Sequence, residues 1–206
     1  MTAAQKTTRV AVPVVWAVAM LAARVFNPWI PIAVAAIGLS AMVLSVDRQL
    51  MRQLLRPALR PFAIGVAGAA VMVAATYLLF PLLSDAIPAI GTRTHDLYSL
   101  FLTGRPRSSV ILFVIPIILA EEILWRGAFQ EWVSTRFAST PLLIATLSAA
   151  AYAIAHAPFG SLLLASIAFL CGLYWSAMRQ ISGSLLPSLI AHLAWDLALV
   201  LVPLHR

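Results

Sequence analysis

Charged residues are scarce in this sequence, and their scarcity decides the class of the protein. Only 10% of the 206 residues are Asp, Glu, Lys or Arg, whereas soluble domains average about a quarter. Hydrophobic residues make up 62% of the chain, and the mean hydropathy is +0.96. This composition excludes a soluble domain and predicts an integral membrane protein.

Cysteine and several catalytic signatures are missing as well. Cys171 is the only cysteine and lies in an apolar run, so a disulfide framework is excluded and a packing role is predicted. The chain contains neither an HExxH sequence, typical of zinc proteases, nor a GxSxG nucleophile motif. Any catalytic chemistry must therefore come from carboxylates and histidines.

Long apolar runs separated by short polar breaks recur along the whole chain. Only helices and closed barrels span lipid, and these runs are too long and too uniform for barrel strands. We predict an all-α, polytopic transmembrane bundle that forms one integral membrane domain over residues 1–206. About seven spans are predicted, with six to eight compatible: 10–26, 29–46, 62–83, 109–132, 141–156, 159–178 and 184–202.

Basic residues give the chain a formal charge of +7, and their positions indicate the partner. Arg48, Arg52, Arg56 and Arg60 recur every four residues among leucines, which predicts a short amphipathic helix on an anionic leaflet. The lipid bilayer, and not nucleic acid, is therefore the expected partner of these charges. The positive-inside rule favours a cytoplasmic N-terminus, with Arg9 counted among the cytoplasmic basic residues.

Six ionisable side chains stand out within the apolar runs of the C-terminal half. Placing four charged side chains at helix centres costs on the order of 10 kcal/mol, which favours a converging functional site inside the bundle. The six candidates for this site are Glu121, Glu122, Arg126, His156, His192 and Asp196.

Helix geometry separates the two adjacent glutamates. Residues four apart share a helix face, so Glu122 lies over Arg126 in the favourable order for an ion pair. Glu121 is rotated by about 100° and has Trp125, not a cation, four residues on. A carboxylate without a counter-ion in an apolar setting is suited to act as a general base. Glu121 is therefore the candidate base, and Glu122 with Arg126 is the expected structural brace.

Two further segments place polar side chains on one helix face each. "YAIAH" aligns Tyr152 with His156, and "HLAWD" aligns His192 with Asp196. A lone histidine in an apolar helix is more often a packing residue than a catalytic one. Three helices that each contribute a polar stripe favour a shared site, which could activate water and stabilise an oxyanion.

Depth within the membrane agrees for two of these residues and disagrees for a third. At about 1.5 Å per residue from the cytoplasmic helix ends, Glu121 and His192 lie roughly 12 to 14 Å deep. His156 comes out at about 22 Å on the same count. Helix tilt, or a different helix start, is needed to bring the three together.

Three motifs together resemble a known family. "EEILWRG" is similar to the EExxxR signature of the CAAX-protease and bacteriocin-processing (Abi) family of intramembrane proteases. "YAIAH" is similar to its FxxxH motif, and "FLCG" leading to "HLAWD" is similar to its FxxG segment and terminal HxxxN or HxxxD motif. The resemblance covers about residues 109–202, whereas the N-terminal half shows only generic membrane helices.

The resemblance implies an endopeptidase that hydrolyses a membrane-anchored or lipidated peptide in the cell membrane. It implies that Glu121 activates the hydrolytic water with help from His156, while the glutamate–arginine pair holds the helix and tunes the site. His192 with Asp196 would bind the scissile carbonyl or its oxyanion. A peptide substrate, the bilayer and no cofactor are therefore expected, and the substrate-binding residues and oligomeric state stay open.

Two departures from the family pattern leave alternatives open. Tyr152 replaces the usual phenylalanine and adds a hydroxyl that can bond to a neighbour. Asp196 stands where asparagine is common, and an ionised aspartate only accepts hydrogen bonds, so it would orient His192 instead. The same donor set would also suit zinc. A metal-independent glutamic mechanism is predicted, and the alternatives are a zinc protease, a non-catalytic immunity or scaffold protein, and a proton- or ion-handling protein.

Overall fold

The computed structural model describes residues 1–137 and 140–204, and no strand occurs in these two ranges. A π-helix, η1 (Glu122–Phe129), joins α6 to α7, and a 3-10 turn, η2 (Ala157–Phe159), follows α8. The α-helices are α1 (Ala3–Val25), α2 (Ile30–Val46), α3 (Arg48–Leu54), α4 (Leu59–Ala86), α5 (Pro88–Leu102), α6 (Arg107–Glu121), α7 (Gln130–Phe137), α8 (Pro141–His156), α9 (Leu162–Ser182) and α10 (Leu186–Leu201).

Within the described residues, five helical runs are long and apolar enough to cross a membrane: α1, α4, Arg107–Phe137, Pro141–Phe159 and α9. Helix α2 qualifies only together with α3, to which it is joined at 101°, and α10 is a shorter apolar helix of 16 residues. The predicted all-α, multi-pass bundle is confirmed, and each predicted span coincides with a helix. By length and composition the spans number five or six rather than seven.

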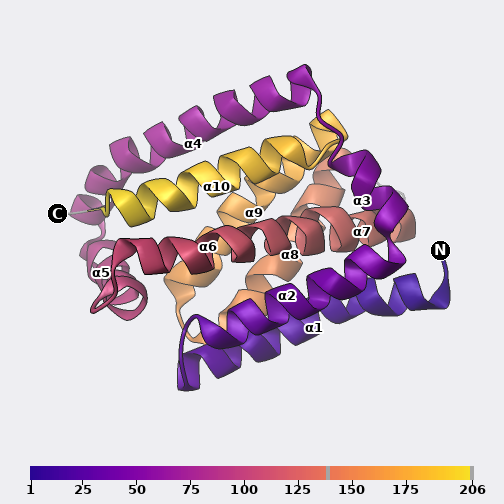
Figure 1. The fold of residues 1–206 in the computed structure, drawn as a ribbon. Helices are drawn as coiled ribbons and strands as arrows, with labels where there is room; N and C mark the ends of the chain where they lie inside the picture. The colour runs from indigo at the N-terminus through magenta and orange to yellow at the C-terminus, as the bar shows by residue number, and fades with distance from the viewer. Residues whose placement is uncertain (138–139, 205–206) are drawn as a thin grey trace.

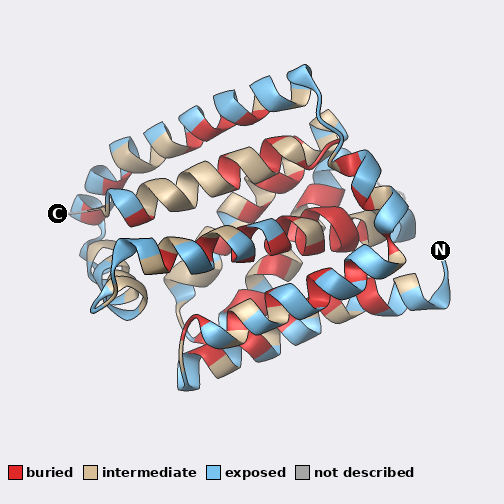
Figure 2. Cartoon of the chain, in the orientation of Figure 1, coloured by how far each residue is buried: buried red, intermediate tan, exposed pale blue. Residues whose placement is uncertain are grey.

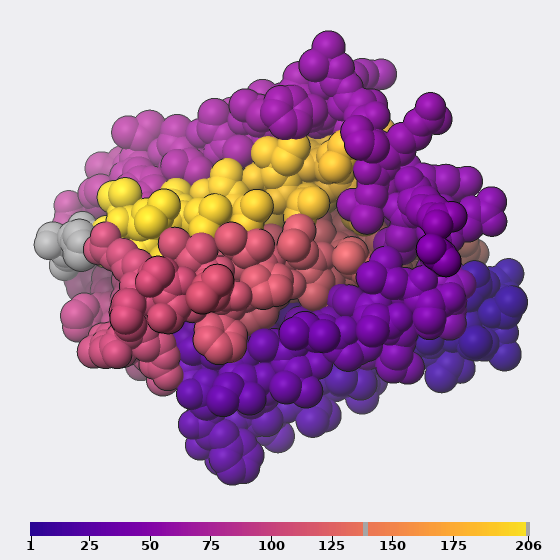
Figure 3. All heavy atoms as spheres, in the orientation of Figure 1, coloured from indigo at the N-terminus to yellow at the C-terminus, as the bar shows by residue number. Residues whose placement is uncertain are grey.

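Helix α6 lies in the middle of the bundle (Figure 1). It packs against α10, which carries α4 on its other side, and against α2, which packs on α1. Helices α8 and α9 pack on each other behind this layer, and the space-filling view shows α4, α10, α6 and α2 side by side on the front face (Figure 3). Burial is concentrated at the end of α6 and in η1, whereas α4 is largely exposed (Figure 2). Apolar side chains such as Leu78 and Leu82 make this exposed surface suitable for lipid.

The predicted amphipathic helix is confirmed as α3, which follows α2 at the sharp bend. Arg48 and Arg52 are exposed, whereas Met51 and Leu54 are buried against the bundle. The helix ends before Pro57, so the other two arginines of the four-residue repeat lie beyond it. The structure thus gives α3 one apolar face toward the protein and one basic face toward the surroundings.

The start of α10 is fixed by α3. Gly183 ends α9 with φ +68°, a left-handed conformation that glycine adopts without strain. The chain then turns so that the Leu185 amide and the Ser184 hydroxyl both donate to the carbonyl oxygen of Leu54, at 2.9 and 3.0 Å. These bonds set where α10, with its His192 and Asp196, begins.

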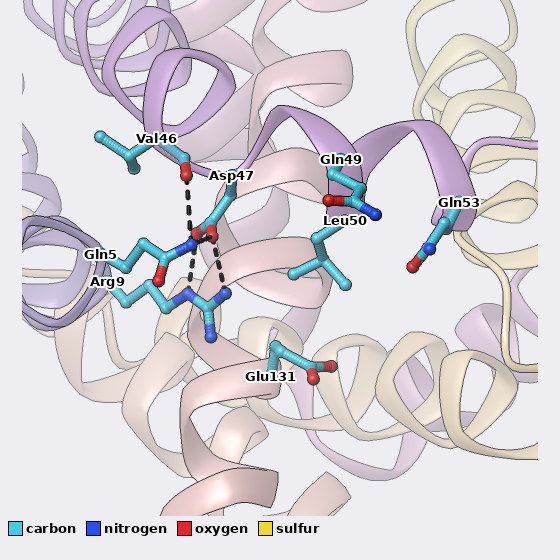
Figure 4. Close-up of a pocket in the computed structure, with 8 residues that line it drawn as sticks. All are labelled: Gln5, Arg9, Val46, Asp47, Gln49, Leu50, Gln53 and Glu131. Atoms are coloured by element: carbon cyan, nitrogen blue, oxygen red, sulfur yellow. Dashed lines mark hydrogen bonds and ion pairs between the residues drawn. The ribbon is translucent and has the colours of Figure 1, made fainter. Parts of the chain in front are cut away.

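A buried ion pair joins α1 to the corner between α2 and α3 (Figure 4). The Arg9 guanidinium donates to both Asp47 carboxylate oxygens at 2.8 Å, and the Gln5 side chain adds a bond of 2.9 Å to the same carboxylate. The Arg9 and Asp47 side chains are only 6% and 1% exposed. The sequence did not indicate this pair, because Arg9 and Asp47 lie too far apart along the chain for spacing to reveal it.

Replacing Asp47 with asparagine tests this pair. We expect Asp47→Asn to lower the free energy of unfolding by about 3–5 kcal/mol, because Arg9 is left buried without a counter-charge. Arg93→Met is the control, since Arg93 and Asp96 form a pair whose side chains are 70% and 55% exposed. The control should cost roughly 0–1 kcal/mol. Equal losses in denaturant unfolding of the two purified variants would contradict the assignment.

Candidate active site

The two glutamates lie where an α-helix becomes a π-helix. Residues Arg107–Phe137 form one helical run, but η1 within it is wound more widely, with the Gln130 amide donating to the carbonyl five residues earlier, on Trp125. Such segments are rare and occur often at functional sites. The prediction of one regular helix is wrong here because η1 packs against α1, α2, α8, α9 and α10 at once, and this packing overrides the regular winding.

Both glutamates reach the same imidazole. Glu122 Oε1 lies 2.9 Å from His192 Nδ1, and Glu121 Oε2 lies 3.6 Å from His192 Nε2. Regular helix geometry predicts that the two side chains diverge, and the structure corrects this expectation. One histidine of α10 is therefore shared between the two carboxylates.

Glu121 is buried and has no guanidinium partner, as predicted, but it is not without contacts. The hydroxyl of Tyr152 donates to its Oε2 at 2.6 Å, so the extra hydroxyl noted in the sequence does bond to a neighbour. The Nε2 atom of His156 lies 3.7 Å from the other oxygen, Oε1. Glu121 is thus fixed by α8 on one side and by α10 on the other.

Glu122 and Arg126 form the predicted pair, with Arg126 Nη1 lying 3.5 Å from Glu122 Oε1 and both side chains 1% exposed. The guanidinium lies between two aromatic rings, 4.5 Å from the centroid of Tyr152 and 5.0 Å from that of Trp175. Cation–π attraction therefore supplements a long ion pair. Gly172 makes room for this arrangement, because a Cβ there would come within 3.0 Å of Tyr152 and 3.4 Å of Arg126.

His192 lies between carboxylates on both of its ring nitrogens. Nδ1 faces Glu122 at 2.9 Å, and Nε2 faces Asp196 Oδ2 at 3.1 Å. The Glu122 contact is a hydrogen bond, whereas Asp196 Oδ2 lies close to Nε2 without the alignment of one. The ring stacks on Trp175 with centroids 3.6 Å apart. The Asp196 side chain is 30% exposed, so the cluster is most open on this side.

His156 joins the cluster from the end of α8 despite the mismatch in estimated depth. The helical run that carries Glu121 continues to Phe137 instead of ending near residue 132. The contacts of Glu121 with both histidines bring the three residues together, so depths counted from predicted helix ends were a poor guide.

All six predicted site residues therefore converge, with Glu121, Glu122 and Arg126 on the α6–η1 run, His156 on α8, and His192 and Asp196 on α10. The sequence motifs missed two tryptophans. Trp175 stacks on His192, and Trp16 of α1 donates its indole N–H to His156 Nε2 at 3.2 Å. Trp16 and His156 are 140 residues apart, so no local spacing links them. The only available signal is that an indole in an apolar helix needs an acceptor.

A zinc centre fits this arrangement poorly. The two His156 nitrogens contact the Tyr152 carbonyl and the Trp16 indole, and both His192 nitrogens face carboxylates. Across residues 1–137 and 140–204, no group of three or more His, Cys, Asp or Glu side chains is arranged to hold a metal ion. Metal independence stays a prediction.

Residues 103–198 match the sequence profile of the family described as "Type II CAAX prenyl endopeptidase Rce1-like". The predicted resemblance is confirmed over nearly the expected range, and all six site residues fall inside it. No curated protein and no solved structure matches the chain significantly. This part of the chain is thus similar to a family of endopeptidases.

Adding a methyl group at Gly172 tests the packing around Arg126. Because the new Cβ would press on Tyr152, we expect Gly172→Ala to destabilise the protein by about 1–3 kcal/mol. Gly38→Ala is the matched control, since Gly38 lies in α2 with no atom within 4 Å of its would-be Cβ. The control should stabilise by roughly 0.5–1 kcal/mol, through helix propensity. Thermal unfolding shifts of the same sign for both variants would argue against the packing.

Proposed function

We propose, taking residues 103–198 as the catalytic part of an Rce1-like protease, that this protein is a glutamic intramembrane endopeptidase. Glu121 is the general base and His156 helps to hold the water. His192 stabilises the developing oxyanion, and Asp196 orients His192. The observation that carries this proposal is the pair formed by Glu121 Oε1 and His156 Nε2, two atoms 3.7 Å apart deep in the bundle.

This distance fits a water molecule shared between the two groups. It is too long for a direct hydrogen bond. The Nδ1 atom of His156 lies 2.7 Å from the Tyr152 carbonyl oxygen, which can only accept, so Nδ1 carries a proton. In the neutral ring Nε2 then has one lone pair, which accepts from the Trp16 indole at 3.2 Å, so the free acceptor for water is the Glu121 carboxylate. A water molecule that donates to Glu121 Oε1 and lies beside the imidazole would be held with its oxygen free to attack a carbonyl.

The reaction follows from these positions. The water oxygen bonds to the scissile carbonyl carbon while one water proton passes to Glu121, which gives a tetrahedral oxyanion. That proton then moves from Glu121 to the amine as the C–N bond breaks, and the other product leaves as a carboxylic acid. Glu121 returns to its ionised state, so one water is consumed and no other reactant is needed.

The proposed donor to the oxyanion is His192. Its Nε2 atom lies 3.6 Å from Glu121 and 3.1 Å from Asp196, beside the position proposed for water. A positively charged imidazole held between Glu122 and Asp196 can donate from Nε2 to negative charge that develops on the substrate. Asp196 cannot itself donate while ionised, which supports an orienting role.

The proposed substrate is a peptide anchored in the membrane, including a lipidated one of the prenylated kind that the family description names. The cluster is buried inside a bundle whose outer surface is apolar, so a peptide has to approach within the bilayer. The partly exposed Asp196 marks the side on which the cluster is most accessible. The cell membrane is the proposed location.

Loss of the Glu121 carboxylate tests the catalytic assignment. Because the amide of Glu121→Gln cannot take a proton from water, we expect kcat/KM for a cleaved lipidated peptide to fall at least about 100-fold. His156→Ala should also lower it. Glu131→Gln is the control, since Glu131 lies on α7 and pairs with Arg179 at 3.3 Å, away from the cluster. This control should keep activity within about threefold of wild type, because it leaves the proposed general base, Glu121, intact.

Unchanged cleavage in both Glu121→Gln and His156→Ala would remove the two residues from the mechanism. Full cellular activity of a folded Glu121→Gln variant would favour the non-catalytic binding protein. Proton or ion flux in proteoliposomes that requires Glu121, without cleavage of any peptide, would favour the proton- or ion-handling protein.

Metal removal separates the glutamic mechanism from a zinc mechanism. Because water is activated by Glu121, we expect treatment with a strong chelator to leave cleavage unchanged, and metal analysis to find far less than one zinc per chain. The control is a purified zinc metalloprotease treated in the same detergent and buffer. One zinc per chain, with activity lost on chelation and restored by zinc, would overturn the proposal.

A further inference from the structure

Trp16 of α1 makes a hydrogen bond to the imidazole of His156. Its indole N–H donates to His156 Nε2 at 3.2 Å, and its side chain is fully buried. Trp16 also packs edge-on against Trp125 of η1, with ring centroids 6.4 Å apart. Trp16 lies outside residues 103–198, so the match to the family gives it no role.

The two bonds of His156 together determine where its proton sits. The Tyr152 carbonyl can only accept, so Nδ1 must be protonated, and an indole N–H can only donate, so Nε2 must carry a lone pair. Neither the other neutral tautomer nor the doubly protonated ring satisfies both contacts. Trp16 therefore selects one tautomer of His156 and one charge state, the neutral one.

We propose that Trp16 is a positioning residue that occupies the Nε2 lone pair of His156, so that the imidazole stays neutral and Glu121 is the free acceptor beside it. The proposal rests on the proposed function for its catalytic consequence, although the tautomer itself follows from the hydrogen bonds alone. The groups that titrate and face His156 are Glu121 from α6 and the hydroxyl of Tyr152 from its own helix, whereas α1 presents the uncharged indole.

The catalytic consequence concerns which group receives the proton from water. A hydrogen bond donated to the Nε2 lone pair opposes protonation of that nitrogen, so the proton passes to Glu121. Without this bond His156 takes up a proton more readily and pairs directly with Glu121, 3.7 Å away. Glu121, the acceptor that holds the water, is then taken up by this pair, although the substrate contacts through His192 stay in place.

Nitrogen NMR of histidine tests the tautomer without reference to activity. In the ¹⁵N-histidine-labelled protein in detergent, with His156 identified by its loss in His156→Ala, we expect a protonated Nδ1 and an unprotonated Nε2. In Trp16→Phe, which keeps an aromatic ring but removes the donor, the His156 signals should shift toward the protonated or exchanging form. A protonated Nε2 in the wild type, or identical signals in Trp16→Phe, would overturn the proposal.

Kinetics test the consequence, with Trp29→Phe as the matched control. Trp29 is also buried and donates its indole N–H to the Phe101 carbonyl at the same distance, 3.2 Å, far from His156 in sequence. Trp16→Phe should lower kcat about tenfold with little change in KM, and the acidic limb of its pH–rate profile should move to higher pH. Trp29→Phe should change neither. Equal effects of the two substitutions on kcat and on the profile would reduce Trp16 to a packing residue.

A second variant covers the case in which Trp16→Phe does not fold. Site-specific replacement of Trp16 by benzothienylalanine puts sulfur in place of the N–H and keeps the shape of the indole. It should give the same NMR and kinetic changes, and wild-type behaviour would overturn the proposal. If the wild type cleaves no peptide, the proposed function fails, but the tautomer measurement still decides the role of Trp16.

Discussion

Three carboxylates converge on the imidazole of His192, and the rest of the structure depends on this interaction. Glu122 and Asp196 face its two ring nitrogens at 2.9 and 3.1 Å, and Glu121 lies 3.6 Å from Nε2. Each buried charge costs several kcal/mol unless it is paired and hydrogen-bonded. The His192 imidazole, and Arg126 beside Glu122, are the partners of these carboxylates, so α6, η1 and α10 have to pack together for the buried groups to be paired.

The surrounding helices hold these charged side chains in position. The wide π-helical turn lets adjacent glutamates reach one histidine, and α3 fixes the start of α10 through the carbonyl of Leu54. Gly172 of α9 leaves space for Arg126 and the aromatic rings on either side of it. Helix α1, outside the family match, is anchored by the Arg9–Asp47 pair at one end and supplies Trp16 to the site. The N-terminal half thus contributes a side chain to the candidate site.

Sequence reasoning identified the helices and six site residues, because apolar runs and residues four apart are local signals. It could not predict η1, since regular winding gives way there to contacts with several other helices. For the same reason it expected Glu121 and Glu122 to diverge. The Trp16–His156 contact and the Arg9–Asp47 pair were missed because the two residues of each are distant along the chain, and such contacts leave no periodic pattern in the sequence. The family roles of the six residues stay predictions.

Isotope labelling during hydrolysis tests the central claim most directly, namely that Glu121 activates water and does not itself attack the peptide. Wild-type protein would cleave a lipidated peptide over many turnovers in ¹⁸O-water, and mass spectrometry would then examine both the product and the protein segment that contains Glu121. The account predicts one ¹⁸O in the new product carboxylate and none in Glu121. Label in the Glu121 carboxylate would reveal an acyl intermediate on that residue and contradict the account.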